Sequence, residues 1–374
     1  FAMFTPKSGG GRVRAVRPWC QQAEFGGSWM RNDKDKYWDC LDQAMEASHR
    51  GRTEEALSWL DEALRAYPAG AEAHNGRGEI LWDDGRIDEA VHEFERAIHA
   101  DSKFIAAHLN RIELMIEELG AFETALQLCD ELLSGRLDLP RPEKSVQAEV
   151  YYLKSKALFY VDDLEGAIFL VRRASKASGD QPAYAAFEGQ MLFELGRFEE
   201  ARRVLEHTAI ADPDSAHIVF YLGLVLEHLE DPAATEAFTR ANSLDPTHYP
   251  MPMEVSREEF EEVIAIALDN LPRSIREYIA NVPILLEDLP SQELIAAENV
   301  SPQILGLFVG SPRTAALATS PSLDLDRVML FIKNHEKICR DREDLIEQIQ
   351  ITVRHEIGHY LGLDEEDMDR LGLA

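Results

Sequence analysis

Gly51-Arg-Thr-Glu-Glu-Ala56 is the first of six related phrases that organise most of the chain. The phrase returns as Gly85-Arg-Ile-Asp-Glu-Ala90, Gly120-Ala-Phe-Glu-Thr-Ala125, Asp162-Asp-Leu-Glu-Gly-Ala167, Gly196-Arg-Phe-Glu-Glu-Ala201 and, in degraded form, Leu229-Glu-Asp-Pro-Ala-Ala234. Successive starts lie 34, 35, 42, 34 and 33 residues apart. In most copies a small residue stands seven positions before the start, and an Ala stands twelve positions after it. A period this regular indicates one supersecondary unit repeated along the chain.

The spacing within each unit predicts two helices joined by a turn. Small residues let the two helices approach closely, Gly or Asp turns the chain, and Pro68, Pro213 and Pro246 end three of the second helices. One such hairpin cannot bury its own apolar face, so neighbouring hairpins stack to form the core. The pattern resembles the tetratricopeptide repeat. This resemblance implies an all-α superhelix of about six repeats over residues 35–250.

A repeat superhelix has a concave inner surface, and the resemblance implies that this surface binds an extended peptide or a protein partner. The candidate partner-binding residues are Asn75, Trp82, Asn110, Tyr152 and Phe159. For each aromatic residue the alternative, which we favour, is packing between neighbouring repeats. The third repeat departs from the pattern, with Glu113 at the position of the small residue.

After about residue 250 the period ends, and the remaining segments predict a small α+β domain over residues 251–374. Ser256 followed by Glu259 is typical of a capping box at a helix N-terminus. Three apolar segments indicate strands, at residues 282–287, 304–310 and 328–332. A long helix is predicted from about Asp341 to Leu361. The Gly-rich residues 1–34 show no period and are expected to form a flexible arm.

The last predicted helix contains His355-Glu356-Ile357-Gly358-His359, an HExxH motif. Positions i and i+4 share one helix face, so both imidazoles can point at the same ion. Two neutral imidazole nitrogens suit Zn²⁺. Glu356 lies beside the metal position, where it can take a proton from the attacking water and deliver it to the leaving amine.

The sequence HEIGHYLGLDEED, together with the order of segments before it, resembles the minimal zincin-like metallopeptidases of bacteria. In that family a compact α+β domain carries HExxHxxGxxD. The resemblance implies His355 and His359 as zinc ligands and Glu356 as the general base. It places the third ligand on Glu365, where the family usually has Asp, with Asp364 and Glu366 as alternatives.

Two upstream features complete the predicted catalytic domain. The resemblance implies that Gly306, Leu307, Phe308 and Val309 belong to the strand that lines the cleft and binds substrate by strand addition. An ordinary core strand is the equal alternative. His335 is expected to be a surface histidine rather than a ligand.

Composition restricts the partners and the compartment. The formal net charge of −30 argues against nucleic acid and anionic membranes, because phosphates would be repelled. No apolar run reaches the length of a membrane span, and no signal peptide is visible. The four cysteines form no ligand-spaced pair, so we expect reduced thiols in a cytoplasmic protein.

The sequence therefore predicts a zinc-dependent endopeptidase that acts on a protein or peptide. Its repeat domain would recruit or sense a partner, and it could hold the peptidase inactive until that partner binds. The alternative is an interaction scaffold whose zincin-like module is latent or inactive. Metal-dependent hydrolysis of a non-peptide bond ranks last, because no phosphate-binding or small-molecule motif accompanies the HExxH.

Overall fold

The computed structural model describes residues 31–135, 142–179, 181–270, 273, 276, 282–310 and 327–361. The predicted flexible arm falls almost entirely on residues 1–30, outside this set. By its contacts the chain divides after Met191 into two compact units. Among the described residues, none of the helices is both long enough and apolar enough to cross a membrane.

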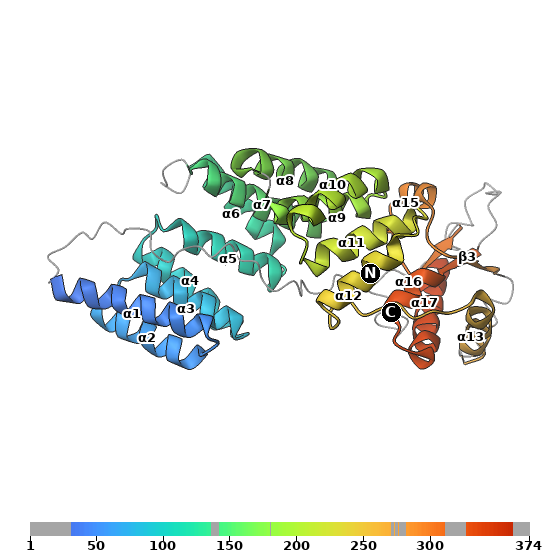
Figure 1. Ribbon diagram of the computed structural model, residues 1–374, viewed down its shortest axis with the longest axis horizontal. Coiled ribbons are helices and arrows are strands. Elements are labelled where there is room, and N and C mark those ends of the chain that lie inside the picture. Colours follow the sequence, from blue (N-terminus) through green and yellow to red (C-terminus); the bar gives the residue numbers. More distant parts are fainter. Residues whose placement is uncertain are drawn as a thin grey trace. The chain divides into compact units, whose positions relative to one another are not determined.

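The first part of the chain is a series of consecutive helices (Figure 1). Helix α1 packs against α2, α3 against α4, α5 against α6, α7 against α8, and α11 against α12. The helices are α1 (Arg31–His49), α2 (Thr53–Ala66), α3 (Ala71–Asp83), α4 (Ile87–Ala100), α5 (Ile105–Glu117), α6 (Phe122–Ser134), α7 (Lys144–Tyr160), α8 (Leu164–Ser178), α9 (Pro182–Glu194), α10 (Phe198–Ala211), α11 (Ala216–His228) and α12 (Ala234–Leu244). The predicted helical hairpins are confirmed.

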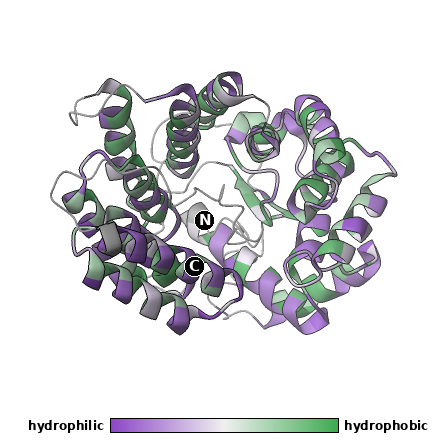
Figure 2. Cartoon of the chain, turned by 60° about the vertical axis from the view of Figure 1, so that its left-hand side comes forward, coloured by the Kyte–Doolittle hydropathy of each residue, from purple (hydrophilic) through white to green (hydrophobic). Residues whose placement is uncertain are grey.

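Small residues allow the two helices of a hairpin to approach closely. A Cβ on Gly78 would lie 2.6 Å from the ring of Phe94, and a Cβ on Gly223 would lie 2.8 Å from the ring of Phe238. Both rings are buried and come from the second helix of the same hairpin. Figure 2 shows that the helices carry hydrophilic and hydrophobic residues on different faces, as stacked hairpins require.

The turn between the helices of a repeat uses a left-handed residue. Gly51, Gly85 and Gly196 have φ values of 68°, 78° and 67°, and Asp162 takes the same conformation with φ of 62°. In the sixth repeat this residue is Glu230, with φ of 54°. The degraded sixth phrase therefore starts one residue later than the sequence suggested, which places Gly223 at the expected small position. Helix α12 then begins at Ala234, four residues after Glu230, whereas α2 and α10 begin two residues after Gly51 and Gly196.

Among the described residues, the C-terminal part forms a three-stranded sheet with helices around it. The strands are β1 (Ile284–Glu287), β2 (Gly306–Val309) and β3 (Arg327–Phe331), and the helices are α13 (Arg257–Asp269), α15 (Gln292–Glu298), α16 (Ile332–Ile338) and α17 (Arg342–Leu361). The strand order is β1-β3-β2, with β1 parallel and β2 antiparallel to β3. The predicted α+β architecture is confirmed, and the predicted capping box of Ser256 and Glu259 begins α13.

Helices α10 to α12 and the C-terminal module lie in the same compact unit and share specific polar contacts. Ser301 Oγ donates to Glu194 Oε2 at 2.6 Å, and Gln303 Nε2 donates to Glu194 Oε1 at 3.0 Å. Gln292 Nε2 donates to the carbonyl of Gly196 at 2.8 Å. The last repeats therefore hold the segment that leads into β2.

A buried ion pair makes a second connection within this unit. Lys337 Nζ of α16 lies 2.5 Å from Glu227 Oε2 of α11, and both side chains are largely buried. Lys333 Nζ lies 3.9 Å from the other oxygen of Glu227. Close by, the amide of Val255 donates to Glu336 Oε1 at 2.9 Å. Because a buried charge is costly without its partner, these contacts fix α16 on α11.

The carboxyl group of Glu194 makes the stability of this unit depend on pH in the mildly acidic to neutral range. Burial raises the pKa of Glu194 from 4.5 to about 7, despite the hydrogen bonds from Ser301 and Gln303 that favour the charged form. A group with a raised pKa stabilises the fold fully below its unfolded pKa, and this stability is lost as the pH rises through the folded value. We expect the thermal midpoint of the unit to fall as the pH rises from 5 to 8, by an amount that corresponds to about 2–3 kcal/mol.

Thermal melts of Glu194→Gln across this range check the expectation, because the neutral amide should flatten the dependence. Glu298→Gln, at an exposed position of α15, is the matched control and should melt with the wild-type pH dependence. Equal slopes for wild type and Glu194→Gln would contradict the assignment.

Candidate metal centre and edge strand

Helix α17 carries the HExxH motif because its opposite face is anchored in the core. Leu345, Ile349, Val353 and Ile357 are buried at helical spacing, in one cluster with Phe260 of α13. At the N-terminus, Asp341 Oδ1 accepts from the amides of residues 343 and 344 at 2.8 and 3.0 Å. The helix is therefore capped at its start and packed along its length, and its position relative to the sheet is fixed.

The motif residues occupy the last turns of this helix. His355 is half-buried, and Glu356 is only 3% exposed. His359 follows one turn after His355, on the same side of the helix axis. The side chain of His359 lies outside the described residues, as do Gly362, Asp364, Glu365 and Glu366. Within the described part of the chain, no three His, Cys, Asp or Glu side chains converge as metal ligands.

Glu356 contacts the strand that the sequence singles out for substrate. Its Oε2 accepts a hydrogen bond from the backbone amide of Phe308, with a donor–acceptor distance of 2.6 Å. Phe308 lies in β2, and its half-buried ring packs on the cluster that contains Val353 and Ile357 of α17. The HExxH helix and β2 are thus joined at the proposed general base.

Strand β2 lies at one end of the sheet order, paired with β3 among the described strands. The amide of Phe331 donates to the carbonyl of Leu305 at 2.9 Å, which fixes the hydrogen-bonded pairs of this antiparallel ladder. Backbone groups of Leu307 and Val309 therefore face β3. Those of Gly306 and Phe308 point away from β3, toward the outer edge of the sheet.

Gly306 sets the distance between β2 and α17. A Cβ at this position would lie 2.5 Å from Thr352 Cγ2, 3.1 Å from the carbonyl oxygen of Met329 and 3.2 Å from Leu330 Cδ2. Thr352 stands one helical turn before Glu356, on the side of α17 that meets the strand. Because Gly306 has no side chain, β2 can lie close to α17. The amide of Phe308, two residues further along the strand, then reaches Glu356.

Several candidate residues of the repeats are buried inside their own unit. Asn110 Nδ2 donates to Asn75 Oδ1 at 3.0 Å and to Glu79 Oε1 at 2.6 Å. Trp82 is buried with its ring edge against Phe94. Asn75, Asn110 and Trp82 are each at most 3% exposed, so their side chains pack and hydrogen-bond within the repeats. Partner binding at these residues remains a prediction.

The two candidates of the fourth repeat also make aromatic contacts. Phe159 is buried and meets the ring of Phe187 at a centroid distance of 5.5 Å. Tyr152 is half-buried, with its ring 4.7 Å from that of Tyr184. These contacts agree with the packing that we favoured for the aromatic residues, and partner binding at Tyr152 and Phe159 remains a prediction.

The expectation of a surface position for His335 is wrong. Its side chain is fully buried, its Nδ1 lies 2.9 Å from the carbonyl oxygen of Phe331, and its ring packs edge-on against Phe260. The neutral ring with hydrogen on Nδ1 satisfies that carbonyl. Burial lowers the pKa of His335 to about 4, so it is a neutral core residue near neutral pH.

Sequence reasoning missed the residues that join the last repeats to the C-terminal module. The signal was a break in the repeat pattern, because Glu227 occupies the position that holds Trp82, Phe159 and Phe193 in other repeats. An acid at a buried aromatic position needs a cation, and Lys337 supplies it.

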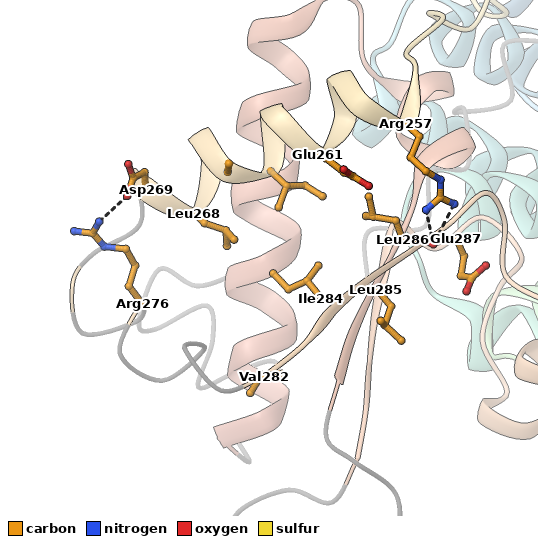
Figure 3. Close-up of a pocket in the computed structure, with 12 residues that line it drawn as sticks. Arg257, Glu261, Leu268, Asp269, Arg276, Val282, Ile284, Leu285, Leu286 and Glu287 are labelled. Atoms are coloured by element: carbon orange, nitrogen blue, oxygen red, sulfur yellow. Dashed lines mark hydrogen bonds and ion pairs between the residues drawn. The ribbon is translucent and has the colours of Figure 1, made fainter.

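A cavity of about 720 Å³ lies between α13 and β1, the strand at the opposite end of the sheet from β2. Figure 3 shows Arg257 reaching from α13 to the backbone carbonyl of Leu286, which it contacts at 3.3 Å through both terminal nitrogens. Ile264, Leu268 and Ile284 provide apolar lining. The HExxH residues are absent from the described lining, so this cavity is separate from the candidate metal centre.

Comparisons with known proteins agree with this division of the chain. Residues 279–373 match the family model of the zincin-like metallopeptidases. Residues 41–104, 81–138 and 188–247 match the tetratricopeptide repeat. No match was found among curated proteins.

Solved structures resemble the helical part. PilW, described as a widely conserved type IV pilus biogenesis factor, is 15% identical with a TM-score of 0.50, and the match covers 58% of this chain and 96% of that chain. The APC/C hetero-tetramer Cut9-Hcn1 is 16% identical with a TM-score of 0.50, with coverages of 57% and 41%. A pilF structure from Pseudomonas aeruginosa is 18% identical with a TM-score of 0.49, with coverages of 59% and 97%. At these identities the likeness concerns the fold.

Adding a methyl group at Gly306 tests the close contact between β2 and α17. We expect Gly306→Ala to lower the free energy of unfolding by about 1–3 kcal/mol, because the Cβ overlaps Thr352 Cγ2. Thr352→Ser removes that methyl group and keeps the hydroxyl that donates to the carbonyl of Gln348. Denaturant melts of the two single variants and the double variant should therefore show partial rescue. Strictly additive losses would rule out this contact as the cause.

Proposed function

Since the chain joins a zincin-like metallopeptidase domain to tetratricopeptide repeats, we propose that it is a zinc-dependent endopeptidase whose repeats recruit a protein partner or the substrate. One observation carries the catalytic part of the proposal. The acid of the HExxH motif is buried at the contact between α17 and β2, instead of projecting into solvent as on a surface helix.

The donor set fits zinc. His355 and His359 provide two imidazoles one turn apart on α17, and the third ligand is Glu365, with Asp364 and Glu366 as alternatives. When bound, Zn²⁺ polarises the scissile carbonyl and acidifies the attacking water. Glu356 takes the proton from that water and later delivers it to the leaving amine. Removal of the metal should therefore abolish cleavage without unfolding the repeats.

Strand addition provides a way to hold an extended peptide. Gly306, Leu307, Phe308 and Val309 form the strand at the end of the described sheet, and the outward backbone groups of Gly306 can pair with a substrate main chain. Main-chain pairing selects an extended conformation rather than a particular charge. The substrate class is therefore an unfolded or extended segment of a protein or a peptide.

The repeats provide a partner surface, as tetratricopeptide repeats commonly do. The candidate residues Asn75, Trp82, Asn110 and Phe159 would shape this surface from below, while the half-buried Tyr152 can contact a partner directly. The net charge of −30 opposes nucleic acid and anionic membranes as partners.

The compartment is part of the proposal. Cys40, Cys129 and Cys339 are free, buried thiols, which fits a reducing, cytoplasmic environment. For Cys129 and Cys339, burial raises the pKa of the thiol to about 12, so neither is a reactive nucleophile near neutral pH.

The alternative function is an interaction scaffold with a latent or inactive zincin-like module. The same contact favours it in one respect, because Glu356 already has a backbone partner on β2 without any substrate. Retention of partners by a His355→Ala variant, together with no turnover by the wild type, would support the scaffold over the enzyme.

Zinc analysis and cleavage assays separate these functions. We expect about one zinc ion per wild-type chain by mass spectrometry of the metal, and its loss in His355→Ala. Glu356→Gln should keep the metal and cleave a peptide library about 10²- to 10⁴-fold more slowly, because only the proton transfer is removed. Equal cleavage by wild type and Glu356→Gln would overturn the proposed role of this residue.

Two deletions test how the repeats serve the peptidase. Deleting residues 1–250 removes Glu194 and Glu227, so we expect the midpoint of thermal unfolding to fall by about 5–10 °C relative to a chain lacking residues 1–181. The shorter deletion keeps α9 to α12 with the C-terminal module. If the repeats restrain the peptidase, the chain lacking residues 1–181 should show higher basal cleavage than the full chain. Unchanged basal cleavage would count against restraint.

A further inference from the structure

The backbone amide of Phe308 is oriented by the sheet toward the HExxH helix. In the antiparallel β2–β3 ladder, hydrogen-bonded and non-hydrogen-bonded residue pairs alternate, and the amide of Phe331 donates to the carbonyl of Leu305. Phe308 therefore falls in a non-hydrogen-bonded pair, and its backbone N–H and C=O point away from β3. That amide instead donates to Glu356 Oε2 at 2.6 Å. The donor is thus supplied by the strand without breaking a ladder bond.

The acceptor is held as firmly as the donor. Glu356 is 3% exposed, and its helix is anchored on both sides by buried Val353 and Ile357. The contact between Gly306 and Thr352 sets the spacing between β2 and α17. Gly306 lies two residues before the donor Phe308, and Thr352 lies one helical turn before the acceptor Glu356. A hydrogen bond to a carboxylate in such a buried site is strong and directional, so it fixes the side-chain rotamer as well as the charge.

We propose that the main-chain amide of Phe308 positions the carboxylate of Glu356 for its role as general base. This inference rests on the proposed function of Glu356 as general base. The hydrogen bond to Oε2 holds the carboxylate in one orientation at the end of β2. In that orientation it takes the proton from water: one water O–H bond breaks, one carboxyl O–H bond forms, and the same proton later passes to the leaving nitrogen.

The same contact restricts the register of a bound peptide. A substrate strand on the outer edge of β2 cannot use the Phe308 amide without displacing Glu356, which would remove the base from its position. Productive binding therefore pairs the substrate main chain with Gly306 and leaves the bond between Phe308 and Glu356 intact. Phe308 is a positioning residue through its backbone, whatever its ring contributes to packing.

Replacing Phe308 with Pro removes the donor specifically. Pro lacks the amide hydrogen, and position 308 tolerates it because its amide makes no bond in the ladder with β3. Phe308→Ala is the matched control, since it removes the same ring but keeps the amide. We expect kcat of Phe308→Pro to be about 10- to 100-fold below that of Phe308→Ala, with KM within about twofold and zinc content equal. Equal kcat values in two folded variants would overturn the proposal.

Hydrogen–deuterium exchange of the full chain provides a readout that does not depend on activity. The Phe308 amide should be protected in the wild type, although it lies outside the ladder. Glu356→Ala should speed its exchange by about 10- to 100-fold, whereas Glu356→Gln, which keeps a carbonyl acceptor, should retain most of the protection. Unchanged exchange in Glu356→Ala would refute the contact.

The two measurements also separate this inference from the proposed function. If the wild type binds no zinc or cleaves nothing, the enzymatic proposal fails, and with it the catalytic role of the amide. The exchange experiment still decides whether the amide holds Glu356. If the wild type is active and Phe308→Pro matches Phe308→Ala, only the positioning role fails.

Discussion

Close approach of a neighbouring side chain to a glycine backbone is the constraint on which both parts of this protein depend. In the repeats, Gly78 and Gly223 let a Phe ring of the second helix lie against the first. In the C-terminal module, Gly306 lets β2 lie against Thr352 of the HExxH helix. The first contact builds stackable hairpins. The second brings a strand amide within hydrogen-bonding distance of Glu356. A methyl group at such a position must displace a neighbour in a close-packed interior.

Buried polar groups connect the last repeats to the C-terminal module. Glu227 pairs with Lys337, and Glu194 accepts from Ser301 and Gln303, so helices of the last repeats are tied to the segments that carry the sheet. Burial raises the pKa of Glu194, which makes this connection dependent on pH in a way that apolar packing would not be. The last repeats thus act structurally as part of the unit that contains the zincin-like domain. The earlier repeats form a separate compact unit and provide the surface proposed for partners.

The period of the repeats, the helix caps and the HExxH spacing are local properties, and they were predictable. The turn of each hairpin needs a residue in the left-handed conformation, which Gly51, Gly85 and Gly196 provide. Ser256 caps α13 through its own side chain. The register of the sixth turn was misplaced by one residue, because Glu230 takes a conformation that sequence preference assigns to Gly. His335 was misplaced because burial depends on neighbours such as Phe260, which lies far away in the sequence.

The sequence by itself determined that helical hairpins repeat along most of the chain and that two histidines and a glutamate share the last turns of one helix. Hydrophobic period, turn residues and i, i+4 spacing act over a few residues, so they can be read directly from the chain. Only the tertiary structure decided that Asn75, Trp82 and Asn110 are buried. It also decided that Glu227 meets Lys337 and that the carboxylate of Glu356 meets the amide of Phe308. These contacts join residues from different elements, and the packing of those elements, rather than any local pattern, sets the distances between them.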